Sequence, residues 1–417
     1  MSRSATGIAA AALALSPTVA LPGRAATATV LYSFQGGSDG AGPFGDLVDV
    51  AGTLYGITSG GGTGTGAGCP VHLGCGTVYS ITQAGTRTVL YSFQGGSDAA
   101  NPLVGLTNLA GTLYGTTEAG GAMGFGTVFA VTLAGAETVV FSFQGGKDGN
   151  DPDHAGLIDV DGMLYGTTAY GGGVQCQNGS CGTVYSVTPA GAETRLYSFR
   201  GRMEHGHSPR AGLLNVGGTF YGTTVFGGTS GLGTVYSLTL DGTETVLHSF
   251  QGGSDGVSPD SALIYVGGKL YGTTAGGGYA NLGTVYSLTL DGTETVLHFF
   301  QGNSDGADPT YGVINVGDKL YGTTGFGGGK GTSGACFEGC GTVYALTKSG
   351  SETILHAFAG RDGAAPEGGL IEAGGRPLWH HRVRWNWHAR TLQRFGVRRG
   401  FQVSAVMPSP RWREVKQ

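Results

Sequence analysis

The sequence is poor in charge and contains no long hydrophobic run. Only 12% of its 417 residues are Asp, Glu, Lys or Arg, and no segment reaches the roughly 18 consecutive apolar residues that a membrane-spanning helix needs. It also lacks the P-loop and His-Glu-x-x-His motifs of nucleotide-binding proteins and metalloproteases. The pattern Gly-x-Ser-x-Gly occurs only within the recurring Gly-rich Asp turns, as at Gly36 to Gly40, and not as the strand-to-helix elbow of a hydrolase. We therefore expect no transmembrane segment, and we find no signature of catalysis or nucleotide binding.

Basic residues are scarce before the C-terminal region. Ten of the 23 Lys and Arg residues, but only one acidic residue, Glu414, lie at or after Arg376, which leaves 13 basic and 27 acidic residues before it. An acidic surface repels nucleic acid and anionic membranes, because both bind through basic patches. We therefore expect a soluble monomer without a nucleic-acid partner.

Glycine and aromatic residues, in contrast, are abundant and recur at a fixed period. The chain has 84 Gly, 18 Tyr and 18 Phe, and four motifs recur in one order: Leu-Tyr-Gly-Thr-Thr, Gly-Thr-Val-Tyr, aromatic-x-Phe, and a Gly-rich Asp-Gly turn that ends on Pro. The tyrosines of the first motif are spaced by 59, 51, 56, 50 and 50 residues: Tyr55, Tyr114, Tyr165, Tyr221, Tyr271 and Tyr321. A period of about 50 residues is typical of kelch-type β-propeller blades, whereas solenoid turns are shorter.

Each unit contains four predicted strands. In one unit these are Gly156 to Val160, Met163 to Thr168, Thr183 to Thr188 and Glu193 to Phe199, which are rich in Val, Tyr, Thr or Leu and separated by Gly-containing turns. Such a unit forms an antiparallel meander whose apolar face needs a neighbouring copy to cover it. The sequence therefore predicts an all-β fold of stacked four-stranded blades.

The two ends of the repeat region are complementary. Thr29 to Phe34 matches a lone fourth strand, six complete units follow, and a seventh begins at Gly368 to Ile371. A seven-bladed β-propeller over residues 29–375, in which the N-terminal strand completes the last blade, removes the free sheet edges. Six or eight blades are the alternatives.

Residues 376–417 differ from the repeats in composition, because they hold all four Trp and ten basic residues. Codons exist for Pro377 to Arg382 that encode Leu-Tyr-Gly-Thr-Thr when translation starts at the second base of the Pro377 codon. The same one-base shift of the reading frame at Arg384 to Ala389 permits Gly-Gly-Thr-Gly-Thr. We infer that this tail is translated out of frame. We expect it to be disordered, and the seventh blade to lack its second and third strands. An Arg- and Trp-rich arm that binds nucleic acid or membrane is the alternative.

The N-terminus has the pattern of a secretory signal peptide. Arg3 precedes an apolar run from Ile8 to Leu15, and small residues follow near Ala20 and Ala28. We expect residues 1–28 to be a signal peptide cleaved near Ala20 or Ala28, and the mature protein to be secreted or at the cell surface, extracellular or periplasmic. A frayed apolar N-terminus is the alternative.

The LYGTT, GTVY, SF and DG motifs, which recur in one order from Thr29 to Leu370, resemble those of the GloVer tandem-repeat family of bacterial surface proteins. Different members of that family carry different C-terminal anchors. The resemblance implies an exported, surface-associated protein, and it implies no particular activity.

The six cysteines fall in three close pairs: Cys69 with Cys75, Cys176 with Cys181, and Cys336 with Cys340. The connections between LYG and GTV that carry a pair span 20, 16 and 19 residues, whereas the Cys-free ones span 11. A disulfide at the base of each long loop explains this coincidence and suits an exported protein. A zinc site is the alternative, although four thiolates would have to come from blades that are not adjacent.

Two recurring polar positions have structural explanations. An Asp follows the fourth strand in most units, where an Asx-type turn is favoured over a calcium loop because the turn offers one carboxylate among glycines. A His replaces the Tyr of the aromatic-x-Phe motif in three units, which indicates packing rather than a ligand role. These residues are Asp39, Asp98, Asp148, Asp255, Asp305 and Asp362, and His248, His298 and His356.

One loop departs from its siblings, because residues 202–207 replace the usual Gly-x-Asp-Gly turn. Loops of adjacent blades share a face, so its polar residues and those of the preceding blade are expected to converge on a divalent metal or a polar ligand. The candidate residues are Asp153, His154, Glu204, His205, His207 and Arg210. Surface loops that diverge without a function are the alternative, and we expect no other cofactor.

We favour a non-catalytic binding or structural module that contacts a polysaccharide or a surface protein. The contact face is expected to be the one built from the fourth-to-first and second-to-third strand connections. The alternative is a carbohydrate-active hydrolase or lyase on a propeller scaffold, which needs paired carboxylates. Only the loops around Asp153 and Glu204 offer such a pair in the sequence. A purely structural role in a surface layer is a third option.

Overall fold

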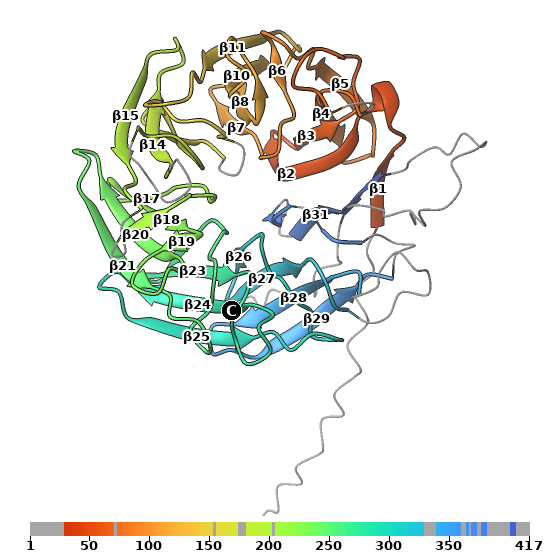
Figure 1. Ribbon diagram of the computed structural model, residues 1–417. Helices are drawn as coiled ribbons and strands as arrows, with labels where there is room; N and C mark the ends of the chain where they lie inside the picture. Colours follow the sequence, from red (N-terminus) through yellow and green to blue (C-terminus); the bar gives the residue numbers. More distant parts are fainter. Residues whose placement is uncertain are drawn as a thin grey trace, which may run out of the picture.

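The described chain forms a ring of antiparallel β-sheets around a central axis (Figure 1). The structure is a computed structural model and describes residues 29–70, 73–152, 156–173, 181–201, 205–328, 339–359, 364–366, 368–372, 377–381 and 401–405. Apart from one 3-10 turn at Gly37–Asp39, every regular element in these ranges is a strand. The fold is therefore the predicted all-β propeller.

Six blades are each built from one continuous stretch of chain, with four strands in sequential order. Blade 1 comprises β2 (Ala41–Val50), β3 (Thr53–Gly60), β4 (Thr77–Thr82) and β5 (Arg87–Ser92); blade 2 comprises β7 (Thr107–Leu109), β8 (Thr112–Thr117), β10 (Thr127–Thr132) and β11 (Glu137–Ser142); blade 3 comprises β12 (Ile158–Val160), β13 (Met163–Thr168), β14 (Thr183–Val187) and β15 (Glu193–Ser198); blade 4 comprises β17 (Leu214–Val216), β18 (Thr219–Thr224), β20 (Thr234–Thr239) and β21 (Glu244–Ser249); blade 5 comprises β22 (Ile264–Val266), β23 (Lys269–Thr274), β24 (Thr284–Thr289) and β25 (Glu294–Phe299); blade 6 comprises β26 (Val313–Val316), β27 (Lys319–Thr324), β28 (Thr342–Thr347) and β29 (Glu352–Ala357).

The first strand of each blade lies nearest the axis and the fourth lies at the outer rim (Figure 1). Two short ladders join the fourth-to-first connection with the second-to-third connection of the following blade: β6 (Ala99–Ala100) pairs with β9 (Ala119–Gly120), and β16 (Gly206–His207) pairs with β19 (Phe226–Gly227). Both kinds of connection therefore lie on one face of the ring, as predicted.

A seventh four-stranded sheet joins the two ends of the chain. Its order is β1 (Thr29–Phe34), β32 (Phe401–Ala405), β31 (Pro377–His381) and β30 (Ile371–Glu372). The N-terminal strand thus completes the last sheet, as predicted. The expected loss of the second and third strands is wrong, because β31 and β32 fill those places. The physical reason is that β1 and β30 each present an unpaired sheet edge, and extended segments of the tail satisfy their backbone groups. The other residues of the predicted tail, and the predicted signal peptide at 1–28, lie outside the described residues.

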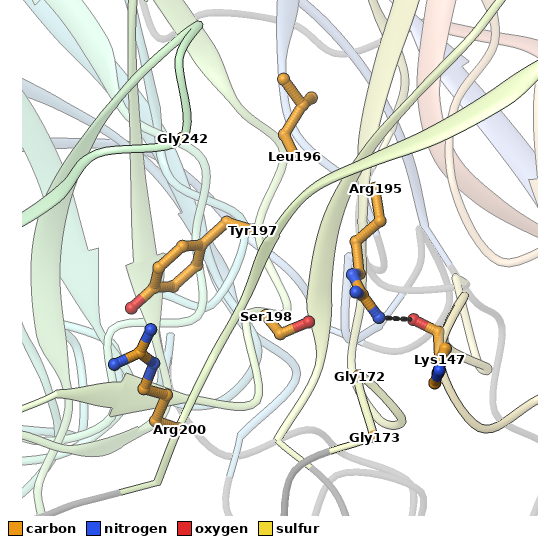
Figure 2. Close-up of a pocket in the computed structure, with 9 residues that line it drawn as sticks. All are labelled: Lys147, Gly172, Gly173, Arg195, Leu196, Tyr197, Ser198, Arg200 and Gly242. Atoms are coloured by element: carbon orange, nitrogen blue, oxygen red, sulfur yellow. Dashed lines mark hydrogen bonds between the residues drawn. The ribbon is translucent and has the colours of Figure 1, made fainter.

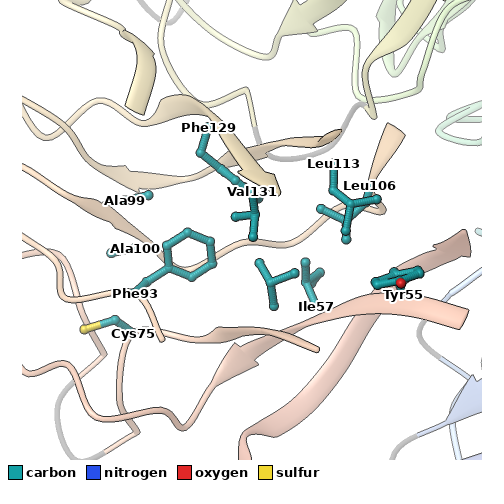
Figure 3. Close-up of a cluster of buried hydrophobic side chains, with 11 residues drawn as sticks. Tyr55, Ile57, Cys75, Phe93, Ala99, Ala100, Leu106, Leu113, Phe129 and Val131 are labelled. Carbon is teal, nitrogen blue, oxygen red and sulfur yellow. The ribbon is translucent and has the colours of Figure 1, made fainter. Parts of the chain in front are cut away.

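The hydrophobic core lies between the blades. In each of the six continuous blades, the aromatic ring that ends the Gly-Thr-Val-Tyr motif packs edge-to-face on the Phe of the preceding sheet's aromatic-x-Phe motif, with ring centroids 4.9 to 5.3 Å apart. Between blades 1 and 2, Phe93 meets Phe129 in a buried cluster with Ile57, Leu113 and Val131 (Figure 3). Edge-to-face contacts add to the gain from burial, so each blade is stabilised by its neighbours.

The glycine of Leu-Tyr-Gly-Thr-Thr is required because the neighbouring strand comes close. A Cβ atom at Gly166 would lie 2.6 Å from the Tyr185 hydroxyl and 2.8 Å from Tyr185 Cζ. Further along the motif, the buried hydroxyl oxygens of Thr168 and Thr183 lie 2.8 Å apart. Equivalent contacts recur in the other five blades, with Phe129 in place of Tyr in blade 2. The residues common to all units are therefore explained by the packing of the blade.

Candidate functional site

The units differ at the residue that follows the Pro at the start of each one. Six of the seven Pro residues contact the preceding blade: a Cβ atom at Gly182 of blade 3, for example, would lie 2.6 Å from Pro209 Cδ. The fixed Pro therefore places the residue after it at an equivalent position in each unit. The residues at this position are Phe44, Leu103, Asp153, Arg210, Asp260, Thr310 and Glu367.

These variable residues line a cavity of about 590 Å³, which we call the central cavity. Its lining comes from the fourth-to-first connections and the first strands of blades 1 to 6, and it includes Phe44, Leu103, Arg210, Asp260 and Thr310. The other two variable residues, Asp153 and Glu367, lie outside the described residues. A concave site formed where otherwise similar units diverge is the strongest candidate for ligand binding in this fold.

Three carboxyl groups in the central cavity are perturbed by their surroundings. Burial raises the pKa of Asp46, although its Oδ1 accepts a hydrogen bond from the Gly369 N–H. Burial and the nearby Asp308 carboxylate raise the pKa of Asp260 to about 7, and the Arg210 guanidinium opposes the rise. Burial also raises the pKa of Asp308. Asp260 Oδ1 is buried and accepts no hydrogen bond from a described residue. Near neutral pH, Asp260 therefore exchanges between a protonated form that donates a hydrogen bond and an ionised form that only accepts one.

A guanidinium and two aromatic rings complete the central cavity. Arg210 Nη2 donates a hydrogen bond to the Tyr170 hydroxyl at 3.2 Å, which orients the guanidinium, and Arg210 Nε has no partner among the described residues. Phe44 and Tyr311, from blades 1 and 6, meet edge-to-face with ring centroids 6.4 Å apart. The cavity thus combines a planar cation, titratable carboxyls and aromatic surface, which together suit a polyhydroxylated or anionic ligand.

A second pocket, which we call the outer pocket, lies at the rim of blades 3 and 4 and has a volume of about 470 Å³ (Figure 2). Its cationic residues lie on two sides of β15: Arg195 donates a hydrogen bond to the Lys147 carbonyl at 2.8 Å, and Arg200 lies beside the Tyr197 ring on the other side. Three cations in one pocket are unusual for this acidic chain. The outer pocket is therefore a second candidate for an anionic ligand.

The described members of the predicted site do not form one cluster. His205 Nδ1 lies 3.1 Å from Glu244 Oε2 of the next blade, and the His207 ring packs on Phe226 at 5.5 Å. Burial lowers the pKa of His207. Only Arg210 lines the central cavity, and no hydrogen bond or ion pair joins these three residues to one another in the described chain. Asp153, His154 and Glu204 lie outside the described residues.

The sequence prediction missed Asp260, Asp308 and Tyr311, which line the central cavity beside Arg210. The signal that would have found Asp260 is the variation between units at the residue after Pro. Asp308 comes directly before its Pro and Tyr311 two residues after it, so both lie within the same variable segment.

The disulfide prediction is confirmed for the first pair, because Cys69 and Cys75 are bonded with their Cα atoms 4.5 Å apart. Cys181 and Cys340 are also disulfide-bonded, and no described cysteine is free. Their predicted partners, Cys176 and Cys336, lie outside the described residues. Disulfides are typical of proteins in oxidising compartments.

The predicted packing of the His rings is confirmed where the structure describes them, whereas the turn Asp bonds the backbone in another way than the predicted Asx-type turn. Each turn carboxylate accepts a hydrogen bond from the backbone N–H four residues earlier, as Asp98 does from Gln94 at 2.7 Å. The His rings pack edge-to-face on the Phe two residues further along the strand. They also approach the turn carboxylate: His248 Nε2 lies 2.9 Å from Asp255 Oδ1.

Comparison with family models decides the family. The model of the Gloeobacter/Verrucomicrobia repeat matches residues 19–178 and 173–379. The chain belongs to this repeat family. No curated protein matches it. No helix of the described residues is long and apolar enough to cross a membrane.

Several solved structures are similar to this repeat protein at low identity. A gluconolactonase from Xanthomonas campestris is 14% identical with a TM-score of 0.38, covering 71% of this chain and 86% of its own. A puromycin hydrolase is 12% identical with a TM-score of 0.47, covering 83% of this chain and 51% of its own. A Trypanosoma rangeli sialidase is 10% identical with a TM-score of 0.42, covering 92% of this chain and 59% of its own.

Proposed function

We propose that this protein is an exported, surface-associated propeller that binds a polysaccharide in the central cavity without chemically changing it. The observation that carries the proposal is the position of the variable residues. Packing explains the positions that the units share, whereas the residue after each Pro changes between units, and its described examples line the cavity. The disulfide-bonded cysteines support export.

The chemistry of the lining favours binding over catalysis. Arg210, Asp260 and the Phe44–Tyr311 pair offer hydrogen-bond donors, acceptors and apolar ring surface to a sugar. The hydroxyls of Thr107 and Ser261 donate to backbone carbonyls rather than to a side-chain base, and such a base is what activates a nucleophile. Binding by a polar cavity of this kind requires no cofactor.

A carbohydrate-active enzyme is the second candidate, because one observation favours it. Asp260, with its pKa raised to about 7, lies close enough to Asp308 for the two carboxyls to interact. Paired carboxyls with different proton affinities are what an acid and a base of glycoside cleavage need. Turnover of a bound glycan that is lost in Asp260→Asn would support this candidate over simple binding.

The test is a binding screen of the secreted full chain against neutral and acidic oligosaccharides, followed by titration of the best ligand. Arg210→Ala in the central cavity and Arg200→Ala in the outer pocket are matched variants, because each removes one guanidinium. We expect Arg210→Ala to weaken binding at least about tenfold, since it removes a charge-assisted contact, and Arg200→Ala to leave it unchanged. The reverse pattern would move the site to the outer pocket. Binding that neither variant alters, or a ligand that is a surface protein rather than a glycan, would contradict the proposal.

A further inference from the structure

Five blade interfaces place a charged cluster at the same point of the outer rim. It is formed by the aromatic or His residue of the fourth strand, the turn Asp that follows, and the first residue of the fourth strand in the next blade. Between blades 5 and 6 these residues are His298, Asp305 and Glu352. We call them the blade 5–6 triad.

The blade 5–6 triad is compact. His298 Nε2 lies 3.3 Å from Asp305 Oδ1 and 3.8 Å from Glu352 Oε1, and one atom from each residue lies within 4.8 Å of the others. Two ligands held at about 2.0–2.2 Å by a tetrahedral metal ion lie roughly 3.3–3.6 Å from each other. The observed separations are therefore close to those of a metal's coordination shell, and small side-chain movements would complete it.

The triad is largely removed from water and short of hydrogen-bond donors. The side chains of His298, Asp305 and Glu352 are 15%, 21% and 11% exposed. Glu352 Oε1 and His298 Nε2 are buried without a hydrogen bond to a described residue. Two neighbouring carboxyls with so few donors are strongly unfavourable when both are ionised, unless a cation joins them.

One interface of the same protein carries a cation at this point. Between the seventh sheet and blade 1, Arg87 replaces the Glu, and its Nη1 forms an ion pair with Asp39, the equivalent of Asp305. The Arg87 side chain is only 5% exposed. The fold therefore accommodates a buried positive charge beside the turn Asp. Between blades 5 and 6 the next strand begins with Glu352 instead, and a bound cation would supply that charge.

We propose that the blade 5–6 triad is a binding site for a divalent transition metal of the zinc class. An imidazole nitrogen with two carboxylate oxygens is a ligand set that zinc accepts, whereas calcium and magnesium prefer oxygen ligands only. Three protein ligands leave one position for water. The bound ion joins blade 5 to blade 6, so its role is to stabilise the ring at that interface.

The neighbouring interface provides a control within the same chain. Between blades 4 and 5, His248 Nε2 and Asp255 Oδ1 are 2.9 Å apart, but Glu294 does not come within ligand distance of both. Tyr is tolerated at the His position, since Tyr91 occupies it between blades 1 and 2 and its hydroxyl donates to Asp98 at 3.0 Å. His298→Tyr and His248→Tyr are therefore matched substitutions, because each introduces the residue that occupies the same position between blades 1 and 2.

The experiment is to strip the full-length secreted chain with a chelator, add Zn²⁺ and measure bound metal per chain and the melting temperature. We expect His298→Tyr and Glu352→Gln each to lose one Zn²⁺ per chain relative to the parent, and the Zn²⁺-dependent rise in melting temperature to disappear with it. His248→Tyr should keep both. Circular dichroism of the stripped proteins shows whether each variant is folded.

Two outcomes would overturn the proposal. One is a folded parent protein that binds no Zn²⁺, or that binds as much after His298→Tyr as before. The other is a parent protein whose melting temperature Zn²⁺ does not raise. Loss of Zn²⁺ in His248→Tyr alone would place the site at the wrong interface.

Discussion

The close approach of strands within a blade can be tested with a single methyl group. In blade 5, a Cβ atom at Gly272 would lie 2.6 Å from the Tyr286 hydroxyl, 2.8 Å from Tyr286 Cζ and 2.8 Å from Leu263 Cδ2. Real Cβ atoms essentially never come this near to other atoms. Tyr286 is fully buried and Leu263 is 3% exposed, so neither side chain can swing into solvent. Gly272→Ala must therefore move the core or the strand.

The expected cost is that of overpacking a tight core, about 1–3 kcal/mol. With an unfolding entropy of about 2.1 cal/mol/K per residue, a cooperative unit of roughly 350 residues loses about 1.5–4 °C in melting temperature for that change. Replacing Tyr286 by Phe should not rescue the variant, because Cζ remains at 2.8 Å. The Phe129 that naturally faces Gly115 in blade 2 leaves the same requirement for glycine.

Gly276→Ala is the matched control, four residues along the same chain segment. Its nearest atoms to a new Cβ are Asn281 Oδ1 at 3.5 Å and Val257 Cβ at 3.7 Å, which is ordinary contact, and its backbone is not in the left-handed region. Thermal and urea unfolding of both variants should show a loss for Gly272→Ala and a change near zero for Gly276→Ala. Equal stabilities would refute the packing argument for the Leu-Tyr-Gly-Thr-Thr motif.

Three further predictions follow from the blade interfaces, the loops and the last sheet. Burial and the Asp255 carboxylate raise the pKa of Glu294 to about 7, so its protonated form adds stability that is fully present below about pH 4.5 and is lost as the pH rises to about 7. Glu294→Gln should therefore make the melting temperature less dependent on pH between about pH 4.5 and 7. An unchanged pH dependence in this range would contradict the raised pKa. Peptide mapping without reduction should find three bridges within single loops, and Cys69→Ser with Cys75→Ser should cost about 2 kcal/mol by loop entropy; bridges between loops would contradict the pairing. Sequencing codons 376 to 389 should reveal Leu-Tyr-Gly-Thr-Thr in the shifted frame, and restoring that frame should raise the melting temperature; codons that cannot encode the motif would dismiss the idea.

The fold could be predicted from the sequence because local patterns and the period agree. The motif Gly-Thr-Val-Tyr supplies the third strand and aromatic-x-Phe supplies the fourth, and both reappear in the six continuous blades. The seventh sheet was only half predicted. Its β31 and β32 carry no repeat motif, so their pairing depends on the unpaired edges of β1 and β30, which composition does not reveal.

The described members of the predicted site lie apart for a geometric reason. His205 and Arg210 are close in sequence, but the connection that carries them runs from the outer strand of blade 3 to the inner strand of blade 4. Four strands spaced about 4.8 Å apart make a blade roughly 14 Å deep, and five extended residues can span about 17 Å. Residues that are close in the sequence of this loop therefore lie at different distances from the axis of the ring. His205 contacts Glu244 on an outer strand, whereas Arg210 lines the central cavity.

Variation between the units is more informative about function than the residues that they share. Gly272 and its equivalents are fixed by a neighbouring ring, and the Thr pairs by their buried hydroxyl contact, so these positions would be the same whatever the protein binds. Two positions vary without a packing reason. At the first position, the residue after Pro, the side chain lines the central cavity and changes from Phe44 in one unit to Arg210 in another. At the second position, the first residue of the fourth strand, the side chain lies next to the carboxylate of a turn Asp and changes from Arg87 to Glu352. The fold accepts an apolar or a charged side chain at the first position and a cation or a carboxylate at the second. Packing therefore does not fix the residue at either position, and the ligand that is bound there can. For this reason we infer a ligand site at the first position and a metal site at the second.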